Sequence, residues 1–208
     1  MSRPKVKICG LTDPGQAKAI AELGADALGF ILYPKSPRYI EPDRLAALLL
    51  ELPPFVKTVG VFVDEPLDML VEIMRSTGLN LAQLHGAESP EYAHELTRQG
   101  IPWIKALRVG SAKDLEGLAA YGNGYFLLDA KSEKGMGGTG ETFDWSLAKE
   151  AAQKYRIILA GGLSPDNLAQ AITQVSPYGL DISSGVEVSP GVKDLDKVAQ
   201  VFGLLGDL

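Results

Sequence analysis

The feature that most constrains the fold is a repeat along the 208 residues: a short apolar segment followed by a helical pattern, eight times over. The strand-like segments start about 21 to 32 residues apart, close to the length of one strand–helix unit. They cover residues 5–9, 26–32, 57–63, 80–84, 102–108, 124–129, 156–160 and 178–182. Strict alternation predicts a parallel sheet with right-handed crossovers. Eight units favour a closed (β/α)8 barrel of the TIM type, near its minimal length, over an open doubly wound sheet.

Helix signals fall in the gaps between these segments. A capping residue followed by proline predicts helix starts at Asp13-Pro14, Glu41-Pro42, Ser89-Pro90 and Ser164-Pro165. Apolar residues at helical spacing behind Pro66 predict another helix, and Gly78 is typical of its end. We predict two further helices over about 111–120 and 144–153.

Composition excludes several functional classes. The formal net charge of −6 argues against nucleic acid or an anionic membrane surface as the main partner. One cysteine and two histidines cannot form a disulfide or a Cys/His zinc site, so no metal is expected. No apolar run approaches the roughly 18 residues of a membrane span, and residues 1–5 lead into a strand without a signal-peptide core. We therefore expect a protein located in the cytoplasm, and since no linker or low-complexity tract divides the chain, one (β/α)8 domain spanning residues 1–208.

Two reactive side chains end predicted strands, where the active sites of such barrels lie. Cys9 ends the first strand, where a thiolate could act as nucleophile or base, although a lone cysteine is often a small buried hydrophobe. Asp129 ends the sixth strand after four apolar or aromatic residues. A carboxylate there is costly to bury without a partner, but it could also be a helix cap or a loop salt bridge. Strands one and six lie on different sides of a barrel, so the two groups could flank a substrate as base and acid.

Small residues come after the last two strands. Gly161 and Gly162 come after the seventh strand, and Ser183, Ser184 and Gly185 come after the eighth. Either run alone would be an ordinary turn. Together they occupy the two loops in which barrels of this class commonly bind phosphate through backbone N–H groups and a helix N-terminus.

Other polar residues could complete a binding site. Arg38, in the loop after the second strand, could clamp a carboxylate or be a solvated loop arginine. Gln83 and His85 end the fourth strand and alternate in direction with Leu84, so both could face the barrel mouth. His94 lies within a helical pattern and is expected at the surface.

The segment 135–140 matches the pattern G-x-G-x-x-G. It lies several residues beyond its strand, opens no clean helix and lacks an acidic strand end about 20 residues later, which a dinucleotide site requires. Because the segment comes shortly after Asp129, a flexible active-site lid is the better interpretation.

In combination, these motifs resemble the phosphoribosylanthranilate isomerase family. The matching segments are Val6–Thr12, Gly29–Ile40, Val59–Val63, Gln83–Gly86, Leu127–Asp129, Thr142–Trp145, Ala160–Leu163 and Asp181–Glu187. They run in the family's order from about residue 5 to 193. The resemblance implies a (β/α)8 barrel without cofactor. It also implies an Amadori rearrangement of N-(5-phosphoribosyl)anthranilate to 1-(2-carboxyphenylamino)-1-deoxyribulose 5-phosphate in tryptophan biosynthesis.

The resemblance also implies roles for individual residues. Cys9 matches the family's general base and Asp129 its general acid, while Arg38 matches the arginine that faces the anthranilate. Gln83, His85 and Asp181 are expected to contact the substrate, and the two late loops match the phosphate site. We expect local donors to depress the pKa of Cys9, because an unperturbed thiol near 8.5 is only a few per cent thiolate at pH 7. Lys7 is one possible donor, although an inward lysine could equally pair with a carboxylate.

Two other interpretations remain open at this stage. One is another phosphosugar isomerase or epimerase on the same barrel, although an aminoaldose isomerase would use paired aspartates and an epimerase would need metal ligands. The other is a non-catalytic module that binds phosphosugars, which retention of both Cys9 and Asp129 argues against. Family members exist as monomers and as homodimers, and the sequence does not choose between them.

Overall fold

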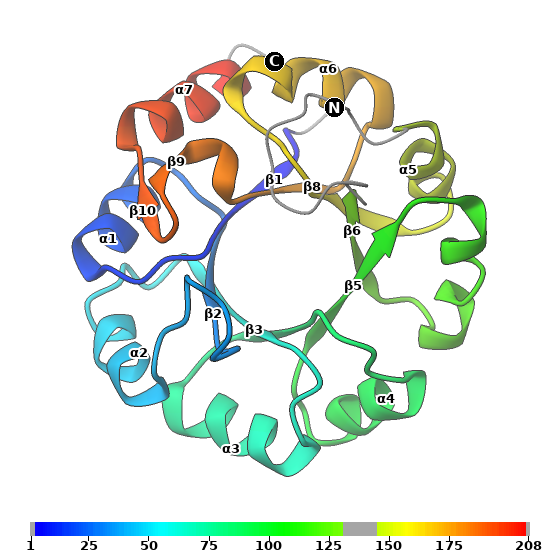
Figure 1. Ribbon diagram of the computed structural model, residues 1–208, viewed down its shortest axis with the longest axis horizontal. Coiled ribbons are helices and arrows are strands. Elements are labelled where there is room, and N and C mark those ends of the chain that lie inside the picture. The colour runs from blue at the N-terminus through cyan, green and yellow to red at the C-terminus, as the bar shows by residue number, and fades with distance from the viewer. Residues whose placement is uncertain (1–2, 131–144, 207–208) are drawn as a thin grey trace.

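The computed structural model describes residues 3–130 and 145–206, and its eight parallel strands close into one barrel in sequence order. Helices surround the barrel on the outside (Figure 1). The strands are β1 Lys5–Cys9, β2 Ala27–Ile31, β3 Lys57–Phe62, β4 Leu81–Leu84, β5 Trp103–Val109, β6 Tyr125–Ala130, β7 Arg156–Leu159 and β8 Gly179–Ile182. The predicted (β/α)8 barrel is confirmed, with every strand within two residues of its predicted ends.

Pairing between β1 and β8 closes the barrel and brings its first and last strands side by side. In that pairing Lys7 lies opposite Asp181, and Cys9 pairs with Gly29 of β2 on its other side. Because side chains alternate along a strand, Lys7 and Cys9 share one face of β1. The register therefore gathers residues from both termini at one end of the barrel.

Most helices of the described residues begin at the predicted proline signals; the fifth and the seventh have no proline at their start, and the seventh is not among the predicted helices. The helices are α1 Pro14–Glu22, α2 Pro42–Leu49, α3 Leu67–Thr77, α4 Pro90–Arg98, α5 Trp145–Ala152, α6 Pro165–Val175 and α7 Leu195–Gly206. The side chains of Asp13 and Ser89 accept backbone N–H bonds at the starts of α1 and α4. Gly78 ends α3 in the left-handed conformation, which glycine adopts without strain. No helix in the described ranges is long and apolar enough to cross a membrane.

One predicted helix is wrong in type. The segment 111–120 forms two short 3-10 helices, η1 Ala112–Leu115 and η2 Leu118–Tyr121. Ser111 and Asp114 close a capping box around the first, and Gly117 separates the two. The segment is too short for a regular helix once a glycine interrupts it.

After β8 the chain forms a small hairpin that no sequence pattern predicted. After the 3-10 turn η3 Ser184–Val186, the strands β9 Glu187–Ser189 and β10 Val192–Lys193 pair antiparallel outside the barrel. Figure 1 shows them beside α1 and α7. The side chain of Gln16 on α1 exchanges hydrogen bonds with the backbone of Lys193, and Thr12 donates to the carbonyl of Gly191.

The core has two parts. A large cluster fills the space between the strands and the helices, with fully buried members such as Phe30, Phe62 and Phe126. A smaller cluster fills the barrel interior through Val59, Ile104, Ala106, Leu127, Ile158 and Ala160. This inner plug separates the two ends of the barrel, so each end presents its own cavity.

Candidate active site

A cavity of about 240 Å³ opens at the carboxyl ends of the strands. Ten of the eleven predicted site residues line it: Cys9, Arg38, Gln83, His85, Asp129, Gly161, Gly162, Asp181, Ser183 and Ser184. The remaining wall includes Ile31, Val61, Leu127, Ala160 and Leu163. Residues 131–144, which contain the predicted lid and the segment 135–140, lie outside the described residues.

Cys9 is buried at the end of β1 beside a lysine. Its Sγ and the Nζ of Lys7 both lie close to the Cα of Gly29, since a Cβ built on that glycine would be 2.7 Å from Sγ and 2.9 Å from Nζ. Any larger residue at position 29 would therefore displace the pair. Lys7 in turn forms a buried ion pair with Asp181, with Nζ 2.8 Å from Oδ1.

The charges around Cys9 act in opposite directions. Burial raises the pKa of the Cys9 thiol, while the ammonium groups of Lys7 and Lys193 lower it. Burial also opposes the charged form of Lys7, but Asp181 and Cys9 outweigh it and raise the pKa of Lys7 to about 12. The net direction at Cys9 is upward, so the expected depression of its pKa is wrong. The lysine is present as anticipated, but desolvation of a fully enclosed thiolate is the larger effect.

Asp129 faces the same cavity from a distant strand. It is the penultimate residue of β6, which lies three strands from β1 around the barrel, and its side chain is 30% exposed. His85 Nε2 lies 3.8 Å from Asp129 Oδ2, which is too long for a hydrogen bond. At this separation a ligand atom on the cavity side can contact both groups at once.

Gln83 orients His85 and offers a second group to the cavity. Gln83 Nε2 lies 2.9 Å from His85 Nδ1, which favours the tautomer with its proton on Nε2, toward Asp129. Within the described part of the chain, Gln83 Oε1 is a buried acceptor without a hydrogen-bond partner. A buried carbonyl oxygen of this kind at a cavity wall points to a ligand donor.

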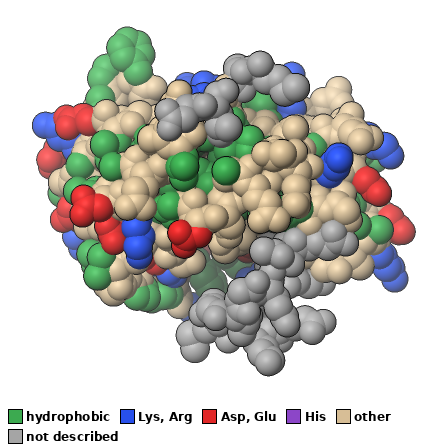
Figure 2. Space-filling view, turned by 90° about the horizontal axis from the view of Figure 1, so that it is seen from above, with side chains coloured by type: hydrophobic (Ala, Val, Ile, Leu, Met, Phe, Trp, Pro, Cys, Tyr) green, Lys and Arg blue, Asp and Glu red, His purple; other side chains and the backbone are tan. Residues whose placement is uncertain are grey.

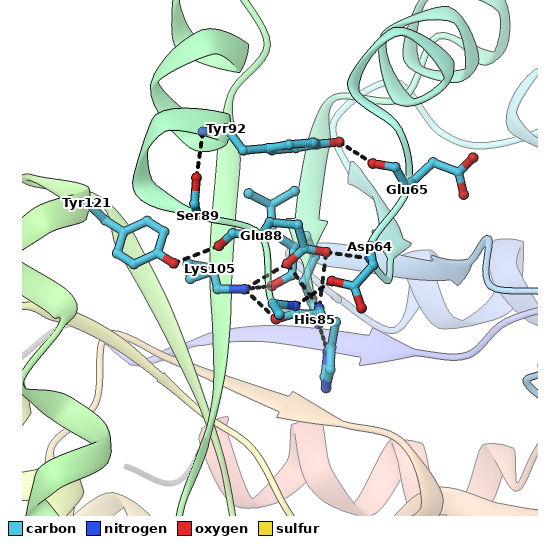
Figure 3. A network of polar contacts seen from close by, with 12 residues as sticks. Asp64, Glu65, His85, Glu88, Ser89, Tyr92, Lys105 and Tyr121 are labelled. Carbon is cyan, nitrogen blue, oxygen red and sulfur yellow. Dashed lines mark hydrogen bonds and ion pairs between the residues drawn. The ribbon is translucent and has the colours of Figure 1, made fainter.

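The loop that carries His85 is held by a buried network that the sequence did not reveal (Figure 3). Lys105 on β5 donates to the carbonyls of Leu84 and Gly86 and to Glu88 Oε2, at 3.3, 2.7 and 2.7 Å. Glu88 also accepts the backbone N–H groups of Asp64 and Gly86. Lys105 and Glu88 belong to consecutive strand–helix units, and no local sequence pattern predicts that they pair. Their contacts in the folded protein show that they fix the turn after β4.

The predicted phosphate loops meet at the rim of the cavity. Gly161 and Gly162 both have positive φ, 86° and 67°, just before α6, so their turn suits glycine. Gly185 does not line the cavity. A Cβ there would lie 1.9 Å from the carbonyl oxygen of Leu163, so the absent side chain lets the loops after β7 and β8 touch.

Arg38 lies across the end of β1, where a Cβ on Gly10 would collide with it. Its guanidinium forms a two-point ion pair with Glu187, at 2.8 Å from Nε and 2.5 Å from Nη2. These bonds raise the pKa of Arg38. The solvated-loop interpretation is therefore wrong, and Arg38 already has one carboxylate partner within the protein. The sequence signal that could have identified Glu187 is its position at the end of the last segment that matches the family, Asp181–Glu187.

A larger cavity, of about 500 Å³, opens at the opposite, amino end of the barrel. Its wall is formed mainly by apolar residues at strand starts, including Val6, Ala27, Val59, Leu81 and Ile158. Lys5 and Asp26 pair at its rim. Lys7 also lines it, but the Nζ of Lys7 pairs with Asp181, which lines the carboxyl-end cavity, so chemistry rather than volume identifies that cavity as the candidate site. Among the described residues, no three His, Cys, Asp or Glu side chains are arranged to hold a metal ion.

Comparison with known proteins gives consistent results. The family model described as N-(5′-phosphoribosyl)anthranilate (PRA) isomerase matches residues 6–203. The chain is 52% identical over 198 residues to N-(5′-phosphoribosyl)anthranilate isomerase of Citrifermentans bemidjiense, covering 95% of each chain.

Solved structures show the same similarity along the whole chain. Phosphoribosyl anthranilate isomerase from Thermotoga maritima superposes with a TM-score of 0.92 and 42% identity, over 99% of this chain and 100% of that one. A complex of such an isomerase with reduced 1-(o-carboxyphenylamino)-1-deoxyribulose 5-phosphate superposes at 0.89 with 39% identity, with the same coverage. Monomers generated from the dimeric T. maritima protein superpose at 0.88 with 38% identity, again with that coverage.

Proposed function

The chain belongs to the N-(5′-phosphoribosyl)anthranilate isomerase family, and from this we propose that Cys9 and Asp129 perform the acid–base steps of its reaction. The protein is an isomerase of tryptophan biosynthesis that converts N-(5′-phosphoribosyl)anthranilate to 1-(2-carboxyphenylamino)-1-deoxyribulose 5-phosphate. The observation that supports the residue roles is that Cys9 and Asp129 line one cavity from non-adjacent strands.

Asp129 acts first, as general acid. Its carboxyl proton goes to the furanose ring oxygen as the bond between that oxygen and C1′ breaks, and the nitrogen lone pair forms an iminium at C1′. His85, whose Nε2 is 3.8 Å from Asp129, is near enough to contact the opened sugar. A positioned acid of this kind accelerates such a step by about 10² to 10⁴-fold.

Cys9 then acts as general base. Its thiolate removes the C2′ proton, which the iminium has made acidic. The resulting enolamine tautomerises to the ketone by taking up a proton at C1′ and losing the proton of its 2′-hydroxyl. Proton exchange with solvent then restores the Cys9 thiolate and the Asp129 carboxyl. Burial opposes the thiolate in the protein alone, while Lys7 favours it. The positive iminium adds a second cation beside the sulfur, so the thiolate becomes more favourable at the step that needs it.

The other lining residues hold the substrate. Arg38 binds the anthranilate carboxylate, and Gln83 Oε1 accepts a hydrogen bond from a substrate hydroxyl or amine. Asp181 contacts the sugar as well as Lys7. The phosphate is bound by backbone N–H groups and hydroxyls of Gly161, Gly162, Ser183 and Ser184, beside the start of α6. Gly185 contributes by letting the two loops touch. The protein works without a cofactor, as one catalytic domain over residues 1–208, in the cytoplasm.

The fluorescence of N-(5′-phosphoribosyl)anthranilate tests these roles, because the isomerisation removes it. We expect rapid decay with the wild type and almost none with Cys9→Ser, whose hydroxyl is a much poorer base, while substrate affinity stays within about a few-fold. Decay at a similar rate in both would move the base to another residue. No decay in either would favour a non-catalytic phosphosugar-binding module.

The surface at the amino end of the barrel supports the proposal that the protein partner is a second copy of this chain. Phe55 is 98% exposed and lies at the edge of the apolar amino-end cavity. Hydrophobic side chains project at the upper edge of the molecule in Figure 2. An aromatic side chain this exposed beside an apolar cavity is typical of an interface. Since a relative from T. maritima is dimeric, the chain forms a homodimer in which each Phe55 enters the amino-end cavity of the other copy.

A further inference from the structure

Arg38 is unusual for an anion-binding residue, because its guanidinium is already bonded to a carboxylate of the protein. Glu187 accepts hydrogen bonds from both Nε and Nη2 of Arg38. Among the described residues, the guanidinium nitrogen left without a hydrogen bond is Nη1. Arg38 and Glu187 alone would form a neutral pair, which attracts a substrate carboxylate weakly.

Lys193 changes that charge balance. Its side chain is fully buried, and its Nζ lies 2.7 Å from Glu187 Oε1 and 3.2 Å from the carbonyl oxygen of Ser183. The backbone N–H of Gly191 donates to the same Glu187 oxygen at 3.2 Å. With two cations and one anion, the cluster of Arg38, Glu187 and Lys193 carries a net charge of +1. Its positive field reaches the catalytic cavity, since Lys193 lowers the pKa of Cys9.

This balance needs an ionised Glu187 and a protonated Lys193; the packing favours the first, whereas the burial of Lys193 outweighs its ion pair and lowers its pKa. Burial would raise the pKa of Glu187, but Arg38 and Lys193 hold it down at about 2. Burial lowers the pKa of Lys193, while Glu187 opposes that effect. Burying the charge of a lysine costs desolvation free energy, so the buried position of Lys193 at the base of this hairpin requires a functional explanation.

We propose that Lys193 is a positioning residue for substrate binding, which offsets the charge of Glu187 so that Arg38 presents a positive Nη1 edge to the substrate carboxylate. Glu187 fixes the orientation of the guanidinium, and Lys193 keeps it attractive to an anion. The inference rests on the proposed role of Arg38. It explains why the β9–β10 hairpin packs over the end of β1: the hairpin delivers both residues to a loop that comes after β2.

The test compares two ligands that differ in one group. Dissociation constants are measured by calorimetry for reduced 1-(2-carboxyphenylamino)-1-deoxyribulose 5-phosphate and for its phenylamino analogue without the carboxyl group. The ratio of the two constants isolates the carboxylate. In Lys193→Gln, whose amide can still donate to Glu187 and Ser183, we expect this ratio to fall about tenfold, the scale of one charge-assisted hydrogen bond.

Two further variants separate charge from structure. Lys105→Gln removes the cation from another deeply buried pair, with Glu88, and should change the affinity of both ligands equally. The double variant Glu187→Gln/Lys193→Gln restores a net charge of +1 and should recover the wild-type ratio within about threefold. If Lys193→Gln does not fold, the double variant decides alone, since loss of the ratio there contradicts the proposal.

The outcomes for Arg38 and for Lys193 can be told apart. If the wild type binds both ligands equally, or Arg38→Ala keeps the ratio, the proposed role of Arg38 is wrong. If Arg38→Ala loses the ratio but Lys193→Gln keeps it, the inference about Lys193 is overturned. Equal weakening of both ligands in Lys193→Gln also overturns it, because Lys193 would then only support the hairpin.

Discussion

The two ends of this barrel are built from the same eight strands, yet they differ in where charge is buried. At the carboxyl end, Lys7, Lys105 and Lys193 are each at most 5% exposed in their side chains, and each pairs with a carboxylate. At the amino end, Lys5 pairs with Asp26 while 56% exposed. The amino-end cavity is about twice as large, at about 500 Å³ against 240 Å³. Buried, partnered charge therefore marks the reactive end, and cavity volume does not.

The cause lies in the segments that are attached to each strand end. The carboxyl ends lead into the longer loops and the helix starts, whose backbone N–H groups and turns surround polar side chains. At the amino ends the strand starts form mainly apolar walls. A buried ion pair costs desolvation energy that folding alone seldom requires, so its concentration at one end indicates a functional demand.

The largest effect that should separate the ends comes from the acid. We expect Asp129→Asn to lower kcat by about 10² to 10³-fold, because the amide has no proton to transfer to the ring oxygen. Tyr178→Phe, at the wall of the amino-end cavity, should leave kcat unchanged. Steady-state fluorescence assays measure both. A near-wild-type kcat in Asp129→Asn would remove Asp129 from its role.

Arg38→Ala tests substrate binding at the carboxyl end. Because Arg38 binds substrate in both ground and transition states, we expect KM to rise about 10 to 100-fold while kcat changes only a few-fold. The same steady-state assay over a range of substrate concentrations separates the two constants. An unchanged KM would mean that Arg38 serves only its ion pair with Glu187.

A substitution at the amino end should change the oligomeric state and leave the catalytic constants unchanged. Phe55→Glu places a charge where the proposed interface is apolar, so we expect the dimer to dissociate while kcat/KM stays within about twofold. Met69→Glu, at another exposed hydrophobic side chain, is the matched control and should remain dimeric. Analytical ultracentrifugation measures both. A wild type that is already monomeric at micromolar concentration would contradict the proposed homodimer.

The smallest expected effect concerns stability at low pH. The pKa of Glu187 in the folded protein is about 2, below its ordinary 4.5, so its stabilising effect is complete above pH 4.5 and is lost as pH falls toward 2. The stability difference between wild type and Glu187→Gln should shrink by about 2 kcal/mol from pH 6 to pH 3.

Asp26 provides the matched comparison at the amino end. Its pKa is also lowered, because the bonds from Lys5, Val6 and Arg3 outweigh its burial, but its ionic partners are exposed. Asp26→Asn should therefore show a loss of less than about 1 kcal/mol over the same interval. Urea unfolding at each pH measures both variants. An equal loss at the two ends would contradict the contrast in buried charge.

Much of the fold could be predicted because its signals are local. Each strand is a short apolar run, and helix starts carry a proline at the first helical position, as at Pro14 and Pro165. The elements that the sequence did not predict are the ones without a strong local signal. The 3-10 helices around Gly117 and the β9–β10 hairpin have weak local patterns, and packing against neighbouring elements decides their form.

The sequence by itself determined the order of the strands and therefore which residues reach the carboxyl end of the barrel. Cys9 and Asp129 could be placed there because a strand's direction and its last residue are local properties. Only the tertiary structure decided how the charges pair. Lys7 meets Asp181 across 174 positions and Arg38 meets Glu187 across 149. It also decided that the pKa of Cys9 is raised, since desolvation depends on every element packed around the sulfur and no local pattern records it.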